Sequence, residues 1–147
     1  MPVIIADKCS RQLLDAFQSK VEVGGFLLGN RYGNTYYMEE ILISRYGGTQ
    51  TSFEAQPSDF VQDLERRLKE HPEYQIIGIW HTHPNGDNCF SMQDEETNRA
   101  YAAVLDGCLS VLVNHVDSFS VFVISENGVC NSFDGSIRKE NMYEKRG

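Results

Sequence analysis

The chain carries little positive charge and no long apolar segment, and each shortage excludes a class of function. Lysine and arginine number 13 against 21 aspartates and glutamates, which gives a formal net charge of −8 at pH 7. Nucleic acids and anionic membrane surfaces bind clustered cations, so the composition disfavours both partners. No stretch of the sequence approaches the roughly 20 apolar residues that span a bilayer. We therefore expect no nucleic-acid partner and no membrane association.

Cysteines at metal-binding or redox spacing are also absent. The four cysteines are scattered along the chain without a Cys-x-x-Cys motif: Cys9, Cys89, Cys108 and Cys130. This distribution favours free thiols in a reducing cytoplasm. The N-terminus lacks the basic lead of a secretory signal, which agrees with a cytoplasmic location.

Length and composition predict a single domain over residues 1–147. The chain has 147 residues, with 41% hydrophobic and 23% charged residues, as is usual for one soluble globular domain. There is no internal repeat and no linker. The polar residues from about position 136 onward are expected to form a flexible tail or a frayed helix.

Hydrophobic periodicity predicts helices that alternate with strands, followed by a run of strands. Helices are expected over residues 7–20, 57–70 and 91–105. Strands are expected over residues 23–28, 36–43, 75–82, 109–113, 119–124 and 129–133. This order is typical of an α+β sandwich, in which helices pack on a mixed, curved sheet.

A histidine pair followed by a serine and an aspartate is the most informative motif. His81 and His83 are separated by one residue, and Ser91 and Asp94 follow. Histidines two apart in a strand project from the same face, so both rings can reach one ion. Two imidazoles and a carboxylate are a natural ligand set for catalytic zinc, with the fourth position left for water. We expect His81, His83 and Asp94 to hold one Zn²⁺.

Simpler interpretations exist for each part of the motif. A His-x-His pair in a strand is often only a polar edge, and Ser91 with Asp94 is a capping-box start of a helix. The helix cap is compatible with metal binding, because a capped helix start is a rigid place to mount Asp94. Glu22 alone would be a surface acid. The joint occurrence of all five residues favours a hydrolytic site, in which Glu22 accepts a proton from the metal-bound water.

The full pattern resembles the JAMM (MPN-plus, JAB) metalloprotease family, whose signature is a glutamate followed by His-x-His-x7-Ser-x2-Asp. Glu22, His81, His83, Ser91 and Asp94 match that signature without a gap. The Glu-x-Gly-Gly-x-x-x-Gly stretch and the proline after the second histidine match as well, so the resemblance spans roughly positions 21–115. It implies a central mixed β-sheet flanked by helices, described as cytidine-deaminase-like.

The resemblance implies roles for the residues of the site. Glu22 would be the general base, and Ser91 would donate a hydrogen bond to the developing oxyanion. No base is evident for Ser91 as a nucleophile. Thr82 points away from the ligands by strand alternation and is expected to pack or to contact substrate, and Asn85 is a second expected substrate contact. Cys89 is expected to fill the loop.

Four other residues are expected to have no part in metal binding. Trp80 is expected in the core and Asp87 as a solvated acid of the loop. The two remaining histidines, His71 and His115, lie outside the motif and are expected to be structural.

For the substrate, the resemblance implies a ubiquitin-like protein cleaved after its C-terminal Gly-Gly. The interval from Asp94 to Leu109 is about one helix long and lacks a Cys/His cluster. Eukaryotic linkage-specific members carry insertions, so this chain looks more like small prokaryotic members, some of which accompany E1- and E2-like enzymes, including those of antiphage operons. One alternative is processing of a sulfur-carrier protein in cofactor or amino-acid biosynthesis. Another is a non-catalytic scaffold, which the five retained residues disfavour.

Overall fold

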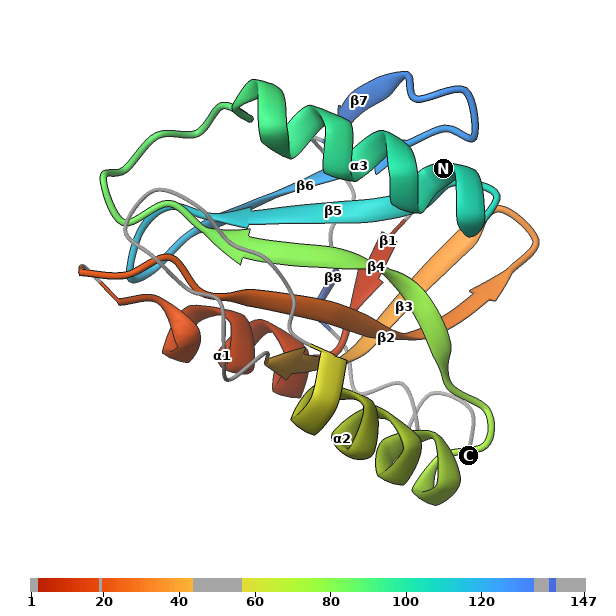
Figure 1. Cartoon of the computed structure of the whole chain (residues 1–147). Coiled ribbons are helices and arrows are strands. Elements are labelled where there is room, and N and C mark those ends of the chain that lie inside the picture. The colour runs from red at the N-terminus through yellow and green to blue at the C-terminus, as the bar shows by residue number, and fades with distance from the viewer. Residues whose placement is uncertain (1–2, 19, 44–56, 134–137, 140–147) are drawn as a thin grey trace.

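In the described part of the chain, eight strands form one mixed sheet against which three helices pack (Figure 1). The computed structural model describes residues 3–18, 20–43, 57–133 and 138–139. The strands are β1 (Val3–Ile5), β2 (Gly24–Tyr32), β3 (Thr35–Ile43), β4 (Gln75–Thr82), β5 (Cys108–Val113), β6 (Phe119–Ile124), β7 (Cys130–Phe133) and β8 (Arg138–Lys139). The helices are α1 (Asp7–Ala16), α2 (Pro57–Glu70) and α3 (Met92–Val104).

The strand order is β7-β6-β5-β4-β2-β3-β1-β8. Neighbours are antiparallel except for three parallel pairs, which are β1 with β3, β1 with β8 and β4 with β5. Parallel neighbours need a crossover connection, and α3 supplies the one between β4 and β5. The predicted α+β class with a mixed sheet and flanking helices is confirmed.

Each helix packs its apolar side chains on a different part of the sheet. Leu13 of α1 lies in the largest buried cluster, together with Trp80 of β4. Leu64 and Leu68 of α2 pack against a second cluster, and Ala102 of α3 is part of a third. Figure 1 shows α3 running along β4, β5 and β6, which places its first turn near the end of β4.

Most element boundaries agree with the sequence prediction, and two differences have local causes. Helix α1 ends at Ala16 rather than near residue 20, because Phe17 is already extended. Strand β2 continues to Tyr32, because its pairing with β3 resumes beyond a register shift between Leu28 and Gly29. Strands β2 and β3 form a hairpin, and Gly33 in its turn has a φ of 58°.

The two ends of the sequence differ from the prediction. Val3 and Ile5 are fully buried in strand β1, which the hydrophobic pattern did not predict. The expected polar tail is wrong at Arg138 and Lys139, which pair in parallel with β1 as strand β8. The rest of that tail, residues 136–137 and 140–147, lies outside the described residues. A two-residue strand has no periodicity of its own, so only its distant partner reveals it.

Strands β4 and β5 approach each other closely at Gly78. A Cβ atom at this position would lie 2.1 Å from the carbonyl oxygen of Leu109. Only glycine fits this contact without movement of the backbone. The contact lies three residues before His81 on the same strand.

Two further expectations concern thiols and membranes. The four cysteines are free, as predicted, with Cys9 and Cys108 buried and Cys89 and Cys130 exposed. Among the described residues, none of the helices has the length and apolarity that a membrane crossing requires.

Candidate metal centre

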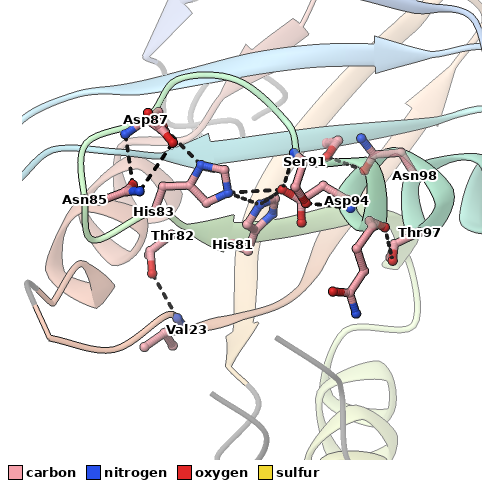
Figure 2. A network of polar contacts seen from close by, with 12 residues as sticks. Val23, His81, Thr82, His83, Asn85, Asp87, Ser91, Asp94, Thr97 and Asn98 are labelled. Atoms are coloured by element: carbon pink, nitrogen blue, oxygen red, sulfur yellow. Dashed lines mark hydrogen bonds and ion pairs between the residues drawn. The ribbon is translucent and has the colours of Figure 1, made fainter. Parts of the chain in front are cut away.

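The end of β4 and the start of α3 bring three donor atoms together. The Nε2 atoms of His81 and His83 lie 3.0 Å apart. The same Asp94 oxygen, Oδ2, lies 3.3 Å from His81 Nε2 and 3.1 Å from His83 Nε2 (Figure 2). Both histidines are buried, and Asp94 is half-buried. The predicted convergence of these three side chains is confirmed.

A capping box holds the Asp94 carboxylate at this position. Ser91 Oγ accepts a hydrogen bond of 3.1 Å from Asp94 N, and Asp94 Oδ2 accepts one of 3.0 Å from Ser91 N. The cap satisfies backbone N–H groups that a helix start leaves unpaired. Since one carboxylate oxygen faces both the cap and the histidines, the helix start also fixes the third donor.

Glu22 reaches the site from the segment just before β2, the strand beside β4. Its segment runs directly into β2, which pairs antiparallel with β4 so that Gly24 lies opposite His81. Glu22 is only 4% exposed. One donor atom from each of Glu22, His81, His83 and Asp94 lies within 4.8 Å of the other three.

Thr82 secures the Glu22 segment to β4. The Thr82 backbone N–H donates to Val23 O at 2.8 Å, and Thr82 Oγ1 accepts from Val23 N at 2.9 Å. The Thr82 side chain is fully buried, so the expectation that it contacts substrate is wrong for this structure. Thr82 is instead packed in the interior and is bonded to Val23, the residue that follows Glu22.

The donor set fits one tetrahedral zinc ion. Zinc lies about 2.0–2.1 Å from histidine nitrogen, so two donors on a tetrahedron are about 3.3 Å apart. The observed separations of 3.0 to 3.3 Å among His81, His83 and Asp94 match that edge. Three acceptor-type atoms facing one another in a buried place repel unless a proton or a cation lies between them.

Burial and hydrogen bonds shift the pKa values of the titratable groups at the site. Burial alone would raise the pKa of Asp94, but hydrogen bonds from His81 and His83 hold that pKa well below its usual range. Burial raises the pKa of Glu22, and the two histidines oppose the rise. For His83, burial lowers the pKa, whereas hydrogen bonds to Asp94 and to the Asp87 carbonyl raise it above the ordinary value.

The loop after β4 supplies the orienting partner of His83. His83 Nδ1 lies 3.1 Å from the backbone oxygen of Asp87. Asn85 shapes this turn, because its Oδ1 accepts from Asp87 N at 3.1 Å and its Nδ2 donates to Asp87 Oδ2 at 3.3 Å (Figure 2). A metal-bound histidine needs such an acceptor to set its tautomer. A backbone carbonyl leaves no signal in the sequence, so this partner is not predictable from residue types.

Two phenylalanine rings continue from His81, with Phe90 next to His81 and Phe122 next to Phe90. The ring of Phe90 lies 5.9 Å from the His81 ring and 4.6 Å from that of Phe122 on β6, measured between centroids. Phe90 was not among the predicted site residues. Through these contacts Phe90 links the loop after β4 to His81 and to β6.

Two cavities flank the donor atoms, and both are lined by Glu22 and Asp94. The loop-side cavity has a volume of about 220 Å³ and is lined by His83, Ser91 and the loop residues Pro84, Asn85, Asp87, Cys89 and Phe90. The helix-side cavity has a volume of about 380 Å³ and is lined by His81, residues of β2 and β4, and residues of α3. Asn85 and Ser91 both line the loop-side cavity, and the expected substrate contact of Asn85 stays a prediction.

The remaining expectations concern residues outside the donor set. Trp80 is buried in the core, as predicted, and its Nε1 donates to Leu42 O at 3.2 Å. Cys89 is exposed, with Sγ 3.6 Å from Asn88 Oδ1. His71 stacks on Tyr74, away from the donor atoms.

Comparisons with known proteins agree with this geometry. The family model described as prokaryotic homologs of the JAB domain matches residues 5–133. COP9 signalosome complex subunit 5 from Candida glabrata is 30% identical over 115 residues, which cover 72% of this chain and 25% of that protein. The chain thus spans about a quarter of the length of this relative.

A solved structure shows the same fold. The solution structure of protein DSY2949 from Desulfitobacterium hafniense matches with a TM-score of 0.64 and 16% sequence identity, over 96% of each chain.

Proposed function

The chain belongs to the prokaryotic homologs of the JAB domain, and we propose that it is a zinc-dependent peptidase or isopeptidase. The proposed substrate is a ubiquitin-like protein or its conjugate, cleaved after a C-terminal Gly-Gly. The proposal extends to a bacterial ubiquitin-like conjugation or antiphage system in the cytoplasm, with E1- and E2-like enzymes encoded nearby. The observation that carries it is the convergence of Glu22 with His81, His83 and Asp94 within 4.8 Å.

His81, His83 and Asp94 would hold the metal, and Glu22 would move the proton. Zinc bound there would polarise the carbonyl group of the substrate and make a bound water more acidic. The Glu22 carboxylate accepts a proton as the water oxygen bonds to the carbonyl carbon, and returns it to the nitrogen as the C–N bond breaks. Burial raises the pKa of Glu22, which suits a group that must both accept and release a proton near neutral pH.

Ser91 can donate a hydrogen bond to the carbonyl oxygen during the reaction. Its Oγ accepts from Asp94 N, and a hydroxyl that accepts still has its own hydrogen to donate. Ser91 also lines the loop-side cavity together with Glu22, His83 and Asp94. An oxyanion donor of this kind is worth about 2.7–4 kcal/mol in transition-state stabilisation.

The test is intact-mass analysis of a ubiquitin-like protein that carries an extension beyond its Gly-Gly. This ubiquitin-like substrate is encoded by a gene next to that of the enzyme. A conjugate in which it is linked through an isopeptide bond is assayed in parallel. We expect zinc-dependent cleavage after the last glycine, which is lost with chelator and with Glu22→Gln. Glu96→Gln, which changes an exposed carboxylate of α3 outside both cavities, should cleave like the wild type.

Two results would contradict the proposal. Undiminished cleavage by Glu22→Gln would show that Glu22 is not the general base. If protein with one bound zinc cleaved neither substrate, the proposed peptidase activity would be wrong. Cleavage of only the linear precursor would favour maturation over deconjugation.

A further inference from the structure

Helix α3 carries Asp94 in its first turn, and its two halves are held to the sheet in different ways. The C-terminal half rests on apolar contacts, with Ala102 fully buried against Cys108 and Ile124. In the described part of the chain, none of the apolar clusters includes a residue of 92–100. The half of α3 that presents Asp94 to the two histidines is therefore held by something other than apolar packing.

A buried hydrogen bond connects this half of the helix to the sheet. Asn98 lies one helical turn after Asp94 (Figure 2) and is 3% exposed, and Ser110 of β5 is fully buried. Ser110 Oγ donates to Asn98 Oδ1 at 2.8 Å. The buried residues of α3 are Asn98 and Ala102, so Asn98 is the buried side chain of the helix that lies nearest to Asp94.

The Ser110 end of this bond lies beside the strand that carries the histidines. Strands β4 and β5 are parallel, and Ser110 pairs with Ile79, two residues before His81. Since residues two apart on a strand share a face of the sheet, Ser110 and His81 point to the same side. The bond thus links the helix of Asp94 to the sheet next to His81, across the same gap that Asp94 Oδ2 spans to reach His81 Nε2 at 3.3 Å.

We propose that Asn98 is a positioning residue of the candidate metal centre. Its hydrogen bond to Ser110 sets the separation of α3 and β4 at which Asp94 can share one zinc ion with the two histidines. Asn98 acts through the position of Asp94 and is not itself a ligand. This inference rests on the proposed function for the identity of the metal and of the reaction.

A hydrogen bond suits this role because it has a preferred length and direction, whereas apolar contact is non-directional. In a buried place, a shift of the helix would also leave the Asn98 oxygen and the Ser110 hydroxyl without partners, which is costly. Zinc–ligand distances are defined to within about 0.2 Å. Even a small displacement of α3 would therefore weaken the bond between Asp94 and the metal.

The first experiment measures the zinc Kd by competition with a chromophoric chelator for the wild type, Asn98→Ala, Ser110→Ala and the double variant. We expect each single substitution to raise the Kd about ten-fold, as is usual for groups that orient metal ligands. Both substitutions remove the same hydrogen bond, so the double variant should also bind about ten-fold more weakly, and not a hundred-fold. Ser110→Ala removes only a hydroxyl, so it remains the deciding variant if Asn98→Ala does not fold.

Ile124→Val is the control for a general loss of stability. It removes one methylene from the apolar cluster under the other half of α3 and leaves the Asn98–Ser110 bond in place. It should bind zinc like the wild type. With Co²⁺ in place of zinc, the visible absorption reports the ligand geometry and should change in Ser110→Ala but not in Ile124→Val. A wild-type zinc Kd in folded Ser110→Ala, or an equal loss of affinity in Ile124→Val, would overturn the inference.

The cleavage assay separates this inference from the proposed function. At saturating zinc, Ser110→Ala should lower kcat about ten-fold with little change in KM, because the substitution moves the metal ligand and not a substrate contact. If the wild type binds zinc and cleaves neither substrate, but the differences in Kd are observed, the proposed function is wrong and the assignment of Asn98 holds. If the wild type cleaves, and Ser110→Ala matches it in Kd, absorption and kcat, the assignment of Asn98 is wrong and the proposed function holds.

Discussion

Replacing Thr82 with valine should loosen the connection between the metal-ligand strand and Glu22. The Thr82 side chain is fully buried, and its Oγ1 accepts a 2.9 Å hydrogen bond from Val23 N. Valine has nearly the same shape but offers no acceptor. The Val23 N–H would then lose its partner, while the 2.8 Å bond from Thr82 N to Val23 O remains.

The expected loss of stability follows from that one unpaired N–H. Leaving a buried donor without a partner costs about 1–3 kcal/mol, and we expect about 1–2 kcal/mol because this hydrogen bond is only partly buried. For a chain of 147 residues, each kcal/mol lowers Tm by about 2–4 °C. The variant should therefore melt about 2–8 °C below the wild type.

Urea and thermal unfolding of the metal-free proteins measure this difference without the contribution of bound metal. Thr82→Ser is the matched control, because it keeps the acceptor and loses only a methyl group. In the zinc-loaded proteins, Thr82→Val should keep one zinc per chain but hydrolyse more slowly, since Glu22 adjoins Val23. Wild-type stability in Thr82→Val, or a larger loss in Thr82→Ser than in Thr82→Val, would refute the reasoning.

Two further predictions concern the metal and the sheet. Zinc added to the metal-free protein should stabilise it by about 2.7 kcal/mol when free zinc is 100 times Kd. Thermal melts should show most of this gain lost in Asp94→Asn and retained in Glu96→Gln; a gain unchanged in Asp94→Asn would exclude Asp94 as a ligand. Gly78→Ala should lower the free energy of unfolding by about 1–3 kcal/mol or more, because its Cβ would lie 2.1 Å from Leu109 O. In urea titrations, Gln75→Ala at an exposed position of the same strand should unfold close to the wild type, and equal midpoints for all three proteins would contradict the prediction.

Much of the fold was predictable because the elements that form it have local patterns. The strand at 75–82, the helix at 57–70 and the strand at 119–124 begin and end where hydrophobic periodicity and turn residues predict. Strands β1 and β8 were not predicted, since each is short and is recognised only by its parallel pairing. Both strands pair with residues far away in the sequence, and Val3 and Ile5 of β1 pack in the largest buried cluster. A local pattern contains neither the pairing nor the packing.

The sequence by itself determined which side chains meet at the candidate metal centre. Residue types, the His-x-His spacing and the helix cap at Ser91 and Asp94 specify three donors, because strand and helix periodicity already orient their side chains. The approach of Glu22 was expected from the family resemblance and not from any local pattern.

Only the tertiary structure decided how these donors are supported and what lies beside them. The Thr82–Val23 connection joins residues 59 positions apart, and the helix-side cavity is lined by residues of β2, β4 and α3, whereas the Asp87 carbonyl behind His83 depends on the conformation of one loop. Backbone carbonyls and cavities have no residue type of their own. The long-range connection and the cavity form only when strand pairing and helix packing bring separate segments into contact. They are therefore properties of the folded chain.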